Sequence, residues 1–499
     1  MKASRSLLQF YQRQNIFLSK SNEIKHFYHR RYYSSFLTSR EIMEYKSPSE
    51  IKSPYKHLEI KNVSVIDFIW KRLDKFPDKI AIECGLSGRK YTFAEIKHLS
   101  QKFAIHLANT GYYTGQTIAL ITENCPEYPI ILYGCLEAGL TVTLVSYLYG
   151  PAEVSHQLKN SDAVCVITSF EKLHTVQKAI NETHSQNKKD IKIIVLDINN
   201  IHLAPITVGR FSEFIYESHN LSLLKNDIDT NNIALLPYSS GTTGLPKGVR
   251  LTHRNIVSNL QQFLQISPIK ETTEDHQDVI PLVLPLYHMY GLSIMNKSFC
   301  RGSKIVTLPK FDPKSFLNTL KSHKCSILFL VPPIIIFLGG NETTSEHLQH
   351  VHTILSAAAP VGPKDLEKCL VKIPKENNAS YIQAYGLTEA TACLTCTDKS
   401  SNLSSSGPPV PNTFIKVISV ENGNILGPYK DGEICSKGPQ IMQGYLNNPK
   451  ATADNVDSEG WLHTGDIGHY DENGEIYIID RIKELIKVKG LQVNELNKY

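Results

Sequence analysis

The sequence predicts an α/β fold in which parallel strands alternate with helices. Three short apolar runs, 117–121, 141–145 and 163–168, are typical of strands, and the ranges 128–139 and 151–158 between them have helical patterns. This alternation is typical of βαβ units and of a parallel sheet. With 499 residues, 41% of them hydrophobic and 20% charged, the chain has the composition of a globular protein of two or three domains.

Helix starts mark the order of the elements outside this region. Residues 63–70 predict an amphipathic helix, and 80–83 predict a strand. Thr92 with Glu95 three residues later forms a capping box, which predicts a helix that begins after Thr92. Thr252 is the expected N-cap of another helix. The apolar residues 233–236 predict a strand shortly before it. Residues 427–444 predict a small β element, and residues 468–478 predict a hairpin.

The positive charge of the chain is concentrated at its N-terminus. The net charge is +5, but residues 1–40 hold eight Lys and Arg against one acidic residue. The remainder is therefore slightly acidic, and we expect no nucleic-acid partner. The basic, serine-rich range 1–37 has the composition of a mitochondrial transit peptide, and the alternatives are a disordered basic tail and a cytoplasmic location. The last three residues are not a peroxisomal signal.

The ten cysteines form no recognisable framework. Cys393 and Cys396 form a single C-x-x-C pair, whereas a metal site of this type needs a second pair nearby. We therefore expect reduced structural thiols. No apolar run reaches the length of a transmembrane helix, and the apolar range 326–340 is interrupted by two prolines.

A loop rich in glycine and hydroxyl groups lies between the predicted strand 233–236 and the helix that begins near residue 252. It reads Tyr-Ser-Ser-Gly-Thr-Thr-Gly-Leu-Pro-Lys-Gly-Val over residues 238–249. Glycines let the backbone N–H groups approach an anion, hydroxyls donate further hydrogen bonds, and a lysine adds charge. The loop therefore predicts a phosphate site, although its spacing is not that of a P-loop. The alternative is a flexible surface loop.

Three further motifs suggest a nucleotide and a second substrate. Tyr385-Gly386-Leu387-Thr388-Glu389 combines an aromatic face, a flexible backbone, a hydroxyl donor and a carboxylate suited to Mg²⁺. Asp466 follows a tight glycine turn, and His288 lies between aromatic residues after the apolar run 279–284. Taken alone, these motifs could equally be a helix cap, a turn aspartate and a packed histidine.

Together these motifs resemble the adenylate-forming (AMP-binding) superfamily. The resemblance is closest to 4-coumarate:CoA ligases, acyl-CoA synthetases and firefly luciferase. It implies a multi-layered N-terminal domain of two βαβ-type sheets and a small β-barrel, over residues 45–479, and a small C-terminal domain that swings. The range 480–499 would then be the hinge and a remnant of that domain.

The resemblance also implies a role for each motif. The loop residues and Lys247 would bind the β- and γ-phosphates of ATP, Tyr385 and Gly386 the adenine, and Thr388 the α-phosphate. Glu389 would hold Mg²⁺, and Asp466 with Arg481 the ribose. His288, Tyr290, Ala357, Ala358 and Ala384 would border the acid and the adenylate. The loop residues concerned are Ser239, Ser240, Gly241, Thr242, Thr243 and Gly244.

The range 480–493 resembles the crossover segment of this superfamily. Lys483 would be the hinge, and Lys487 and Gln492 would reach the adenylate and the carboxylate. The alternative for this range is a charged amphipathic hairpin. Nothing before Tyr499 matches the late Gly-Lys element of the swinging domain. Without that lysine we expect the chain to bind ATP and an acid but to turn over poorly.

The resemblance implies an acid–thiol ligase that uses ATP, Mg²⁺ and CoA. A carboxylate attacks the α-phosphate to give an acyl-adenylate and pyrophosphate, and the CoA thiol then displaces AMP. The alternatives are a truncated binding protein without activity and a luciferase-like or peptide-synthetase-like enzyme. Thr391-Ala392-Cys393 replaces the usual Gly-Pro-Val of coumarate ligases, so the sequence does not specify which acid is used.

Overall fold

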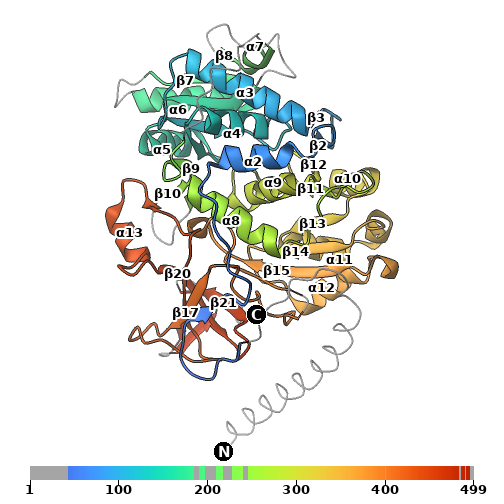
Figure 1. Ribbon diagram of the computed structural model, residues 1–499, viewed down its shortest axis with the longest axis vertical. Coiled ribbons are helices and arrows are strands. Elements are labelled where there is room, and N and C mark those ends of the chain that lie inside the picture. The colour runs from blue at the N-terminus through green and yellow to red at the C-terminus, as the bar shows by residue number, and fades with distance from the viewer. Residues whose placement is uncertain are drawn as a thin grey trace, which may run out of the picture.

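The computed structural model describes most of the chain as layers of sheets and helices (Figure 1). The range 1–37, with its predicted targeting role, lies outside the described residues and that role stays a prediction. So do residues 240–244 of the phosphate loop and the predicted hinge Lys483. The described residues are 43–184, 190–196, 209–216, 228–239, 245–398, 400–482, 485–488 and 491–494.

The first large sheet has eight strands in the order β19-β10-β9-β5-β4-β6-β7-β8. The six strands from β9 to β8 are parallel, whereas β10 and β19 are antiparallel to their neighbours. The expected alternation of strands and helices is therefore confirmed, and the strand predicted at 117–121 is β4. The bounds are β4 Thr117–Ile121, β5 Thr141–Leu144, β6 Cys165–Ser169, β7 Lys192–Leu196, β8 Gly209–Arg210, β9 Ile233–Ser239, β10 Lys247–Thr252 and β19 Gly444–Tyr445.

The second large layer joins two four-stranded sheets, β11-β12-β2-β3 and β13-β14-β15-β16. Ser326 N donates to Val279 O at 2.9 Å, which places β13 beside β11 and makes the layer continuous. All neighbouring pairs within the two sheets are parallel except the outermost, β2–β3 and β15–β16. The bounds are β2 Ile80–Cys84, β3 Lys90–Thr92, β11 Val279–Leu282, β12 Lys304–Thr307, β13 Ile327–Leu330, β14 Thr353–Ser356, β15 Ser380–Tyr385 and β16 Thr395–Cys396.

Helices cover both layers, and the predicted caps are present. Thr92 accepts from Glu95 N, and Glu95 Oε2 accepts from Thr92 N. Thr252 Oγ1 accepts from Asn255 N in the same way. The helices are α2 Val65–Leu73, α3 Phe93–Asn109, α4 Tyr128–Glu137, α5 Pro151–Ser161, α6 Leu173–His184, α7 Phe211–Tyr216, α8 His253–Ile266, α9 Met289–Arg301, α10 Pro313–Ser322, α11 Pro332–Gly340, α12 Pro363–Leu370 and α13 Pro449–Asn455.

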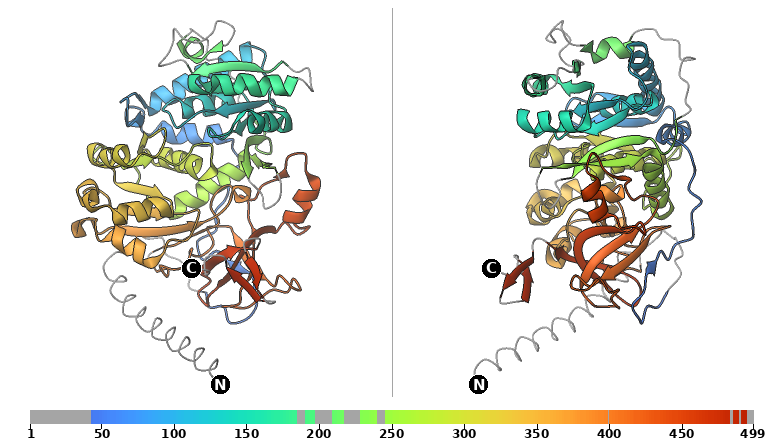
Figure 2. Two further views of the ribbon diagram at one scale, coloured as in Figure 1. Left: turned by 180° about the vertical axis from the view of Figure 1, so that it is seen from behind. Right: turned by 90° about the vertical axis from the view of Figure 1, so that its left-hand side faces the viewer.

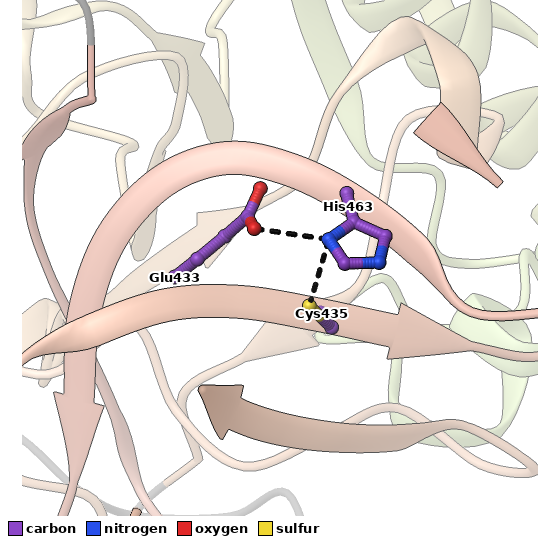
Figure 3. Close-up of side chains that lie close together, drawn as sticks. All are labelled: Glu433, Cys435 and His463. Carbon is purple, nitrogen blue, oxygen red and sulfur yellow. Dashed lines mark hydrogen bonds and ion pairs between the residues drawn. The ribbon is translucent and has the colours of Figure 1, made fainter. Parts of the chain in front are cut away.

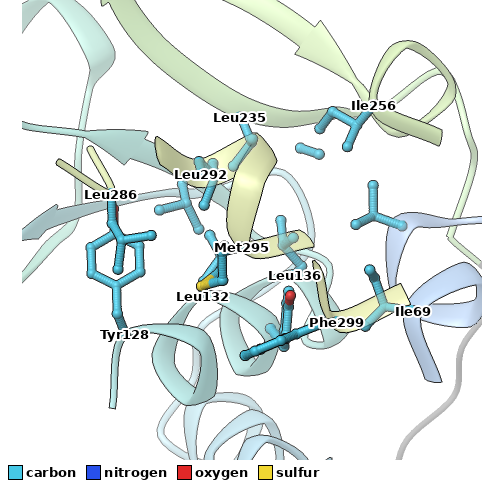
Figure 4. Packing of buried hydrophobic residues seen from close by; sticks show 14 of the residues in the cluster. Ile69, Tyr128, Leu132, Leu136, Leu235, Ile256, Leu286, Leu292, Met295 and Phe299 are labelled. Carbon is cyan, nitrogen blue, oxygen red and sulfur yellow. The ribbon is translucent and has the colours of Figure 1, made fainter. Parts of the chain in front are cut away.

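The largest core lies where helices of the two layers meet (Figure 4). All ten residues of α4 are buried, which explains why its sequence is apolar on every side. Leu292, Met295 and Phe299 of α9 pack in the same cluster as Leu132 and Leu136 of α4. The face of α9 that carries these three residues is therefore anchored against the first sheet layer.

The C-terminal part forms a five-stranded antiparallel sheet, in the order β1-β17-β18-β20-β21. It corresponds to the predicted small β-barrel, but its outer strands β1 and β21 do not pair within the described residues, so the barrel is open. The predicted hairpin near 468–478 is β20–β21. The bounds are β1 Ile51–Lys52, β17 Phe414–Ile418, β18 Gly432–Lys437, β20 Leu462–Tyr470 and β21 Ile476–Arg481.

Two details of this part differ from the sequence analysis. The range 427–444 was expected to form one small β element, but β19 at its end pairs with β10 of the first large sheet. The strand β1 was not expected at all, and it pairs with β17. Near the end of the chain, β22 (Leu485–Val488) and β23 (Leu491–Asn494) form a separate two-stranded sheet. No helix within the described residues is long and apolar enough to cross a membrane.

Candidate functional site

The predicted phosphate loop connects the two strands of a hairpin. β9 ends at Ser239 and β10 begins at Lys247, and these two residues are opposite each other in the antiparallel pair. Ser240, Gly241, Thr242, Thr243 and Gly244 lie between them and outside the described residues. The loop is shorter than we expected, because Lys247, Gly248 and Val249 already belong to β10. The hairpin holds Ser239 and Lys247 at the base of the loop.

Lys247 and Glu389 both contact Tyr445. Lys247 Nζ lies 5.0 Å from the centroid of the Tyr445 ring, and the Tyr445 hydroxyl donates to Glu389 Oε1 at 2.8 Å. The pairing of β19 with β10 places Tyr445 opposite Val249, close to Lys247. Sequence reasoning missed Tyr445, since only this long-range strand pairing brings it to the loop.

Glu389 is the described carboxylate best placed for a metal ion at this loop. It lies in the single turn Thr388–Ala390, is 8% exposed, and its backbone carbonyl accepts from Met442 N at 2.8 Å. Its carboxylate is a hard oxygen ligand, which suits Mg²⁺. The nearby Ser239 Oγ is buried, and among the described residues it has no hydrogen bond of normal geometry. This is expected of a hydroxyl that donates to a bound anion. These groups therefore fit a magnesium–phosphate ligand.

Three residues predicted to bind the nucleoside come together from separate segments. The Tyr385 hydroxyl donates to Asp466 Oδ2 at 2.7 Å, and Arg481 Nε pairs with Asp466 Oδ1 at 3.0 Å. Asp466 and Arg481 are opposite each other in the β20–β21 hairpin, while Tyr385 ends β15. Asp466 is 3% exposed, and its burial raises the pKa of its carboxyl above the usual range although Arg481 opposes the shift.

A second polar group fixes the turn that leads to Asp466 (Figure 3). Glu433 Oε2 lies 2.9 Å from His463 Nδ1, and Glu433 Oε1 accepts from Gly465 N at 3.1 Å. Cys435 Sγ lies 3.6 Å from the same His463 nitrogen. The hydrogen bond to Glu433 raises the pKa of His463. Glu433, Cys435 and His463 could geometrically hold a metal ion, but their hydrogen bonds already account for them as supports of the turn.

His288 and Thr388 line one cavity between the two large layers. The cavity has a volume of about 250 Å³, and Tyr238, Tyr149 and Ser146 form other parts of its wall. His288 is the N-cap of α9, and its side chain remains accessible to solvent. Partial desolvation lowers the pKa of His288, so the imidazole is neutral at pH 7.

The residues predicted to border the acid are distributed along one wall. Tyr290 is half-buried, and its hydroxyl donates to Leu330 O at 3.2 Å. Ala384, in β15, and Ala357 are half-buried and pack against the main core. Ala358 is exposed and has a φ of 77°, a left-handed conformation that is strained for alanine.

Gly386 is required by its packing against the following turn. A Cβ added to Gly386 would lie 1.7 Å from Ala392 O. Ala392 and Thr391 both have positive φ values, 98° and 54°. The chain therefore turns back tightly after Glu389, and this turn carries the residues that replace Gly-Pro-Val.

Lys487 and Gln492 are placed opposite each other in the β22–β23 sheet. Residues 485–494 thus contain a hairpin, the form named as the alternative for this range, and the roles of these two residues and of Lys483 stay predictions. The described structure brings Lys247 and Glu389 to Tyr445, and Tyr385 and Arg481 to Asp466. His288 and Thr388 line one cavity, and the roles of all these residues stay predictions.

Comparisons with known proteins identify the family of the chain. The family model described as AMP-binding enzyme matches residues 69–446. The 4-coumarate–CoA ligase 2 of Solanum tuberosum is 37% identical over 444 residues, which are 87% of this chain and 78% of the relative.

Two solved structures show the same fold at lower identity. The luciferase-like enzyme of the nonluminescent mealworm Zophobas morio has a TM-score of 0.77 at 23% identity, and the match covers 88% of this chain and 100% of that one. ATP-bound MatB of Rhodopseudomonas palustris has a TM-score of 0.74 at 23% identity over 87% and 82% of the two chains. The family match spans more than half of the sequence, and the chain therefore belongs to the AMP-binding enzyme family, in its class of acid–CoA ligases.

Proposed function

We propose that this chain joins a carboxylic acid to CoA in two steps driven by ATP. In the first step a carboxylate oxygen attacks the α-phosphorus, the bond to the bridging oxygen breaks, and pyrophosphate leaves. In the second step the CoA sulfur attacks the acyl carbon, the bond to the AMP oxygen breaks, and the thiol proton is lost to a base. The coumarate ligase relative and the ATP-bound structural neighbour support this reaction class.

The observation that carries the proposal is the meeting of Tyr385, Asp466 and Arg481. Tyr385 comes from β15 and the other two residues from the β20–β21 hairpin, and their hydrogen bonds hold the Asp466 carboxylate in one orientation. A fixed buried carboxylate can accept both hydroxyl groups of a ribose. Tyr385 then presents its ring beside the same position, where a purine can pack on it.

The phosphates would lie at the other end of the site, between Ser239, Lys247 and Glu389. Lys247 attracts the phosphate charge, and Ser239 offers an unused hydroxyl donor. Bound Mg²⁺ would neutralise the charge that develops on pyrophosphate. Tyr445 orients the Glu389 carboxylate through its 2.8 Å hydrogen bond, so that the ligand oxygen is preorganised.

The second step is assigned to the cavity shared by His288 and Thr388. A neutral imidazole at the cavity wall can accept the proton of an attacking thiol. Partial desolvation keeps His288 neutral, which is the state that this role requires. The cavity is thus the proposed meeting point of the acyl group and CoA.

The test is a pyrophosphate-release assay with ATP, Mg²⁺, CoA and a broad panel of acids, with the acyl-CoA product identified by mass spectrometry. We expect release with at least one acid and a thioester that depends on CoA. His288→Ala should reduce thioester formation more than pyrophosphate release, because the residue acts in the second step. Nucleotide binding without pyrophosphate release for any acid would instead indicate a binding protein.

We further propose that the basic range 1–37 directs the chain to mitochondria. Its composition supports this address, with eight Lys and Arg and one acidic residue in residues 1–40. N-terminal sequencing of the protein purified from its source tests the proposal. A mature chain that still begins at Met1 would contradict it.

A further inference from the structure

One cation on the acid side has no anionic partner. Lys297, in α9, is only 4% exposed, and its Nζ lies 4.2 Å from the centroid of the Phe263 ring in α8. Among the described residues, no carboxylate pairs with this ammonium and no carbonyl accepts from it. Moving an ammonium out of water costs more than one aromatic face returns. Burial lowers the pKa of Lys297, and an anion beside the ammonium would offset this cost, but the described residues do not provide one.

The neighbouring thiols do not supply that anion. Cys393 and Cys396 are the groups that act electrostatically on Lys297. Burial raises the pKa of both thiols, and Lys297 only partly opposes the shift. They are therefore protonated at neutral pH, and the charge of Lys297 is not compensated by a thiolate.

Lys297 lies on the same face of α9 as Tyr290, one of the residues predicted to border the acid. Tyr290 and Lys297 are seven residues apart in α9, which is two helical turns, so they share a face. That face is opposite to the one with Leu292, Met295 and Phe299, which packs into the core seen in Figure 4.

The surroundings of the two residues overlap as well. Tyr290, like Lys297, interacts electrostatically with Cys393 and Cys396. The two cysteines in turn pack against Ala384, which directly precedes Tyr385. Lys297 thus shares with Tyr290 one face of α9 and the surroundings of the two cysteines, two helical turns further from His288.

We propose that Lys297 binds the far end of the acid, and that the preferred substrate is a dicarboxylic acid whose second carboxylate pairs with the Lys297 ammonium. This inference rests on the proposed function. The nine residues from His288 to Lys297 span roughly 13 Å along the helix, and the lysine side chain leans back toward the helix start. Diacids of medium length fit within this span, since an extended carbon chain advances roughly 1.3 Å per bond.

The experiment compares acids of equal length that differ only in the second carboxylate. Pyrophosphate release is measured with octanoic and octanedioic acid, and with the matching pairs from four to ten carbons. For the unmodified chain we expect kcat/KM to be at least about tenfold higher for a diacid than for its monoacid partner. Equal values, or a preference for the monoacid at every length, would overturn the proposal.

The Lys297→Met variant removes the charge and keeps the apolar stem. We expect it to lose the preference for the diacid while its activity with the monoacid is unchanged or higher. Its melting temperature should be equal or higher, because an unpaired buried cation is replaced by an apolar group. Lys297→Gln, which keeps hydrogen-bonding capacity, separates loss of charge from loss of volume. Lys314→Met, which changes an exposed lysine, is the matched control and should keep the preference.

A binding measurement separates failure of this inference from failure of the proposed function. The melting temperature is recorded with a non-hydrolysable ATP analogue and each acid, which requires no turnover. A diacid that stabilises the unmodified chain but not Lys297→Met supports the role of Lys297 even if no acid yields pyrophosphate. The role of Lys297 would be contradicted if Lys297→Met lost the stabilisation by the monoacid and by the diacid to the same extent. It would also be contradicted if no diacid raised the melting temperature of the unmodified chain.

Discussion

The two ends of the site differ in how their charges are compensated. On the proposed nucleotide side, Asp466 accepts from Tyr385 and Glu389 accepts from Tyr445, so each carboxylate has a partner from a distant segment. On the proposed acid side, an aromatic ring and neutral thiols are the described groups that interact with Lys297. By this proposal the nucleotide side is preorganised by the protein alone, whereas the acid side is completed by its ligand.

The largest expected effect comes from Glu389→Gln. The amide cannot replace the carboxylate as a magnesium ligand, so pyrophosphate release should fall by about 10²- to 10³-fold. The amide carbonyl can still accept from Tyr445, so the melting temperature should hardly change. The loss should be the same for monoacids and diacids. A loss of activity confined to monoacids or to diacids would show that Glu389 also affects the choice of acid.

Asp466→Asn should act on the nucleotide alone. Hydrogen bonds to charged groups contribute about 1.5–3 kcal/mol, so the KM for ATP should rise by roughly 10- to 100-fold. Steady-state kinetics with ATP and the acid varied in turn measure this effect. The KM for the acid should stay within about twofold, on the same reasoning. An equal rise in both KM values would show that Asp466 also supports the acid wall.

Tyr445→Phe tests the residue that sequence reasoning missed. It removes the hydroxyl that donates to Glu389 but keeps the ring beneath Lys247. A single hydrogen bond contributes about 1 kcal/mol, so activity should fall about fivefold. Tyr445→Leu, which also removes the ring, should cost more. Equal activity of the two variants would assign no role to the contact between the ring and Lys247.

The smallest expected effect is a pH dependence of stability at His463. Its pKa is raised by Glu433, so the folded state binds a proton more tightly than the unfolded state. This stabilisation is complete below the ordinary histidine pKa of about 6.5 and is lost as the pH rises through the higher folded pKa. Compared with His463→Gln, the unmodified chain should gain about 1 kcal/mol or less at pH 6 and nothing at pH 9. Chemical denaturation at both pH values measures the difference, and an equal gain at both would exclude the charged pair.

Sequence reasoning found the features that depend on neighbouring residues. Thr92 and Thr252 cap helices because each side chain bonds a backbone N–H three residues later, which a short pattern reveals. The strand at 117–121 was found because four of its five residues are apolar, and all five are buried in the structure. The position of Asp466 beside Arg481 could be expected only from the resemblance to a known family, since a bare turn aspartate predicts nothing so specific.

Features that depend on contacts between distant segments were not found. Tyr445 reaches Glu389 only because β19 joins β10, and no local pattern encodes that pairing. Lys297 is in an amphipathic helix, where a lysine normally faces water. Its burial follows from the packing of α8 and of the turn at Cys393 against that face, which the sequence alone does not show.

The pairing of β1 with β17 has a consequence for the folding of the protein during translation. Ile51 is synthesised early, but its partner Ile415 emerges only after every strand of the two large layers except β19 has been translated. During that interval β1 lacks the strand to which it hydrogen-bonds, and its apolar residue Ile51 is accessible to other chains. The five-stranded sheet can therefore close only late in translation. Nascent chains released before residue 414 should be the forms that chaperones retain.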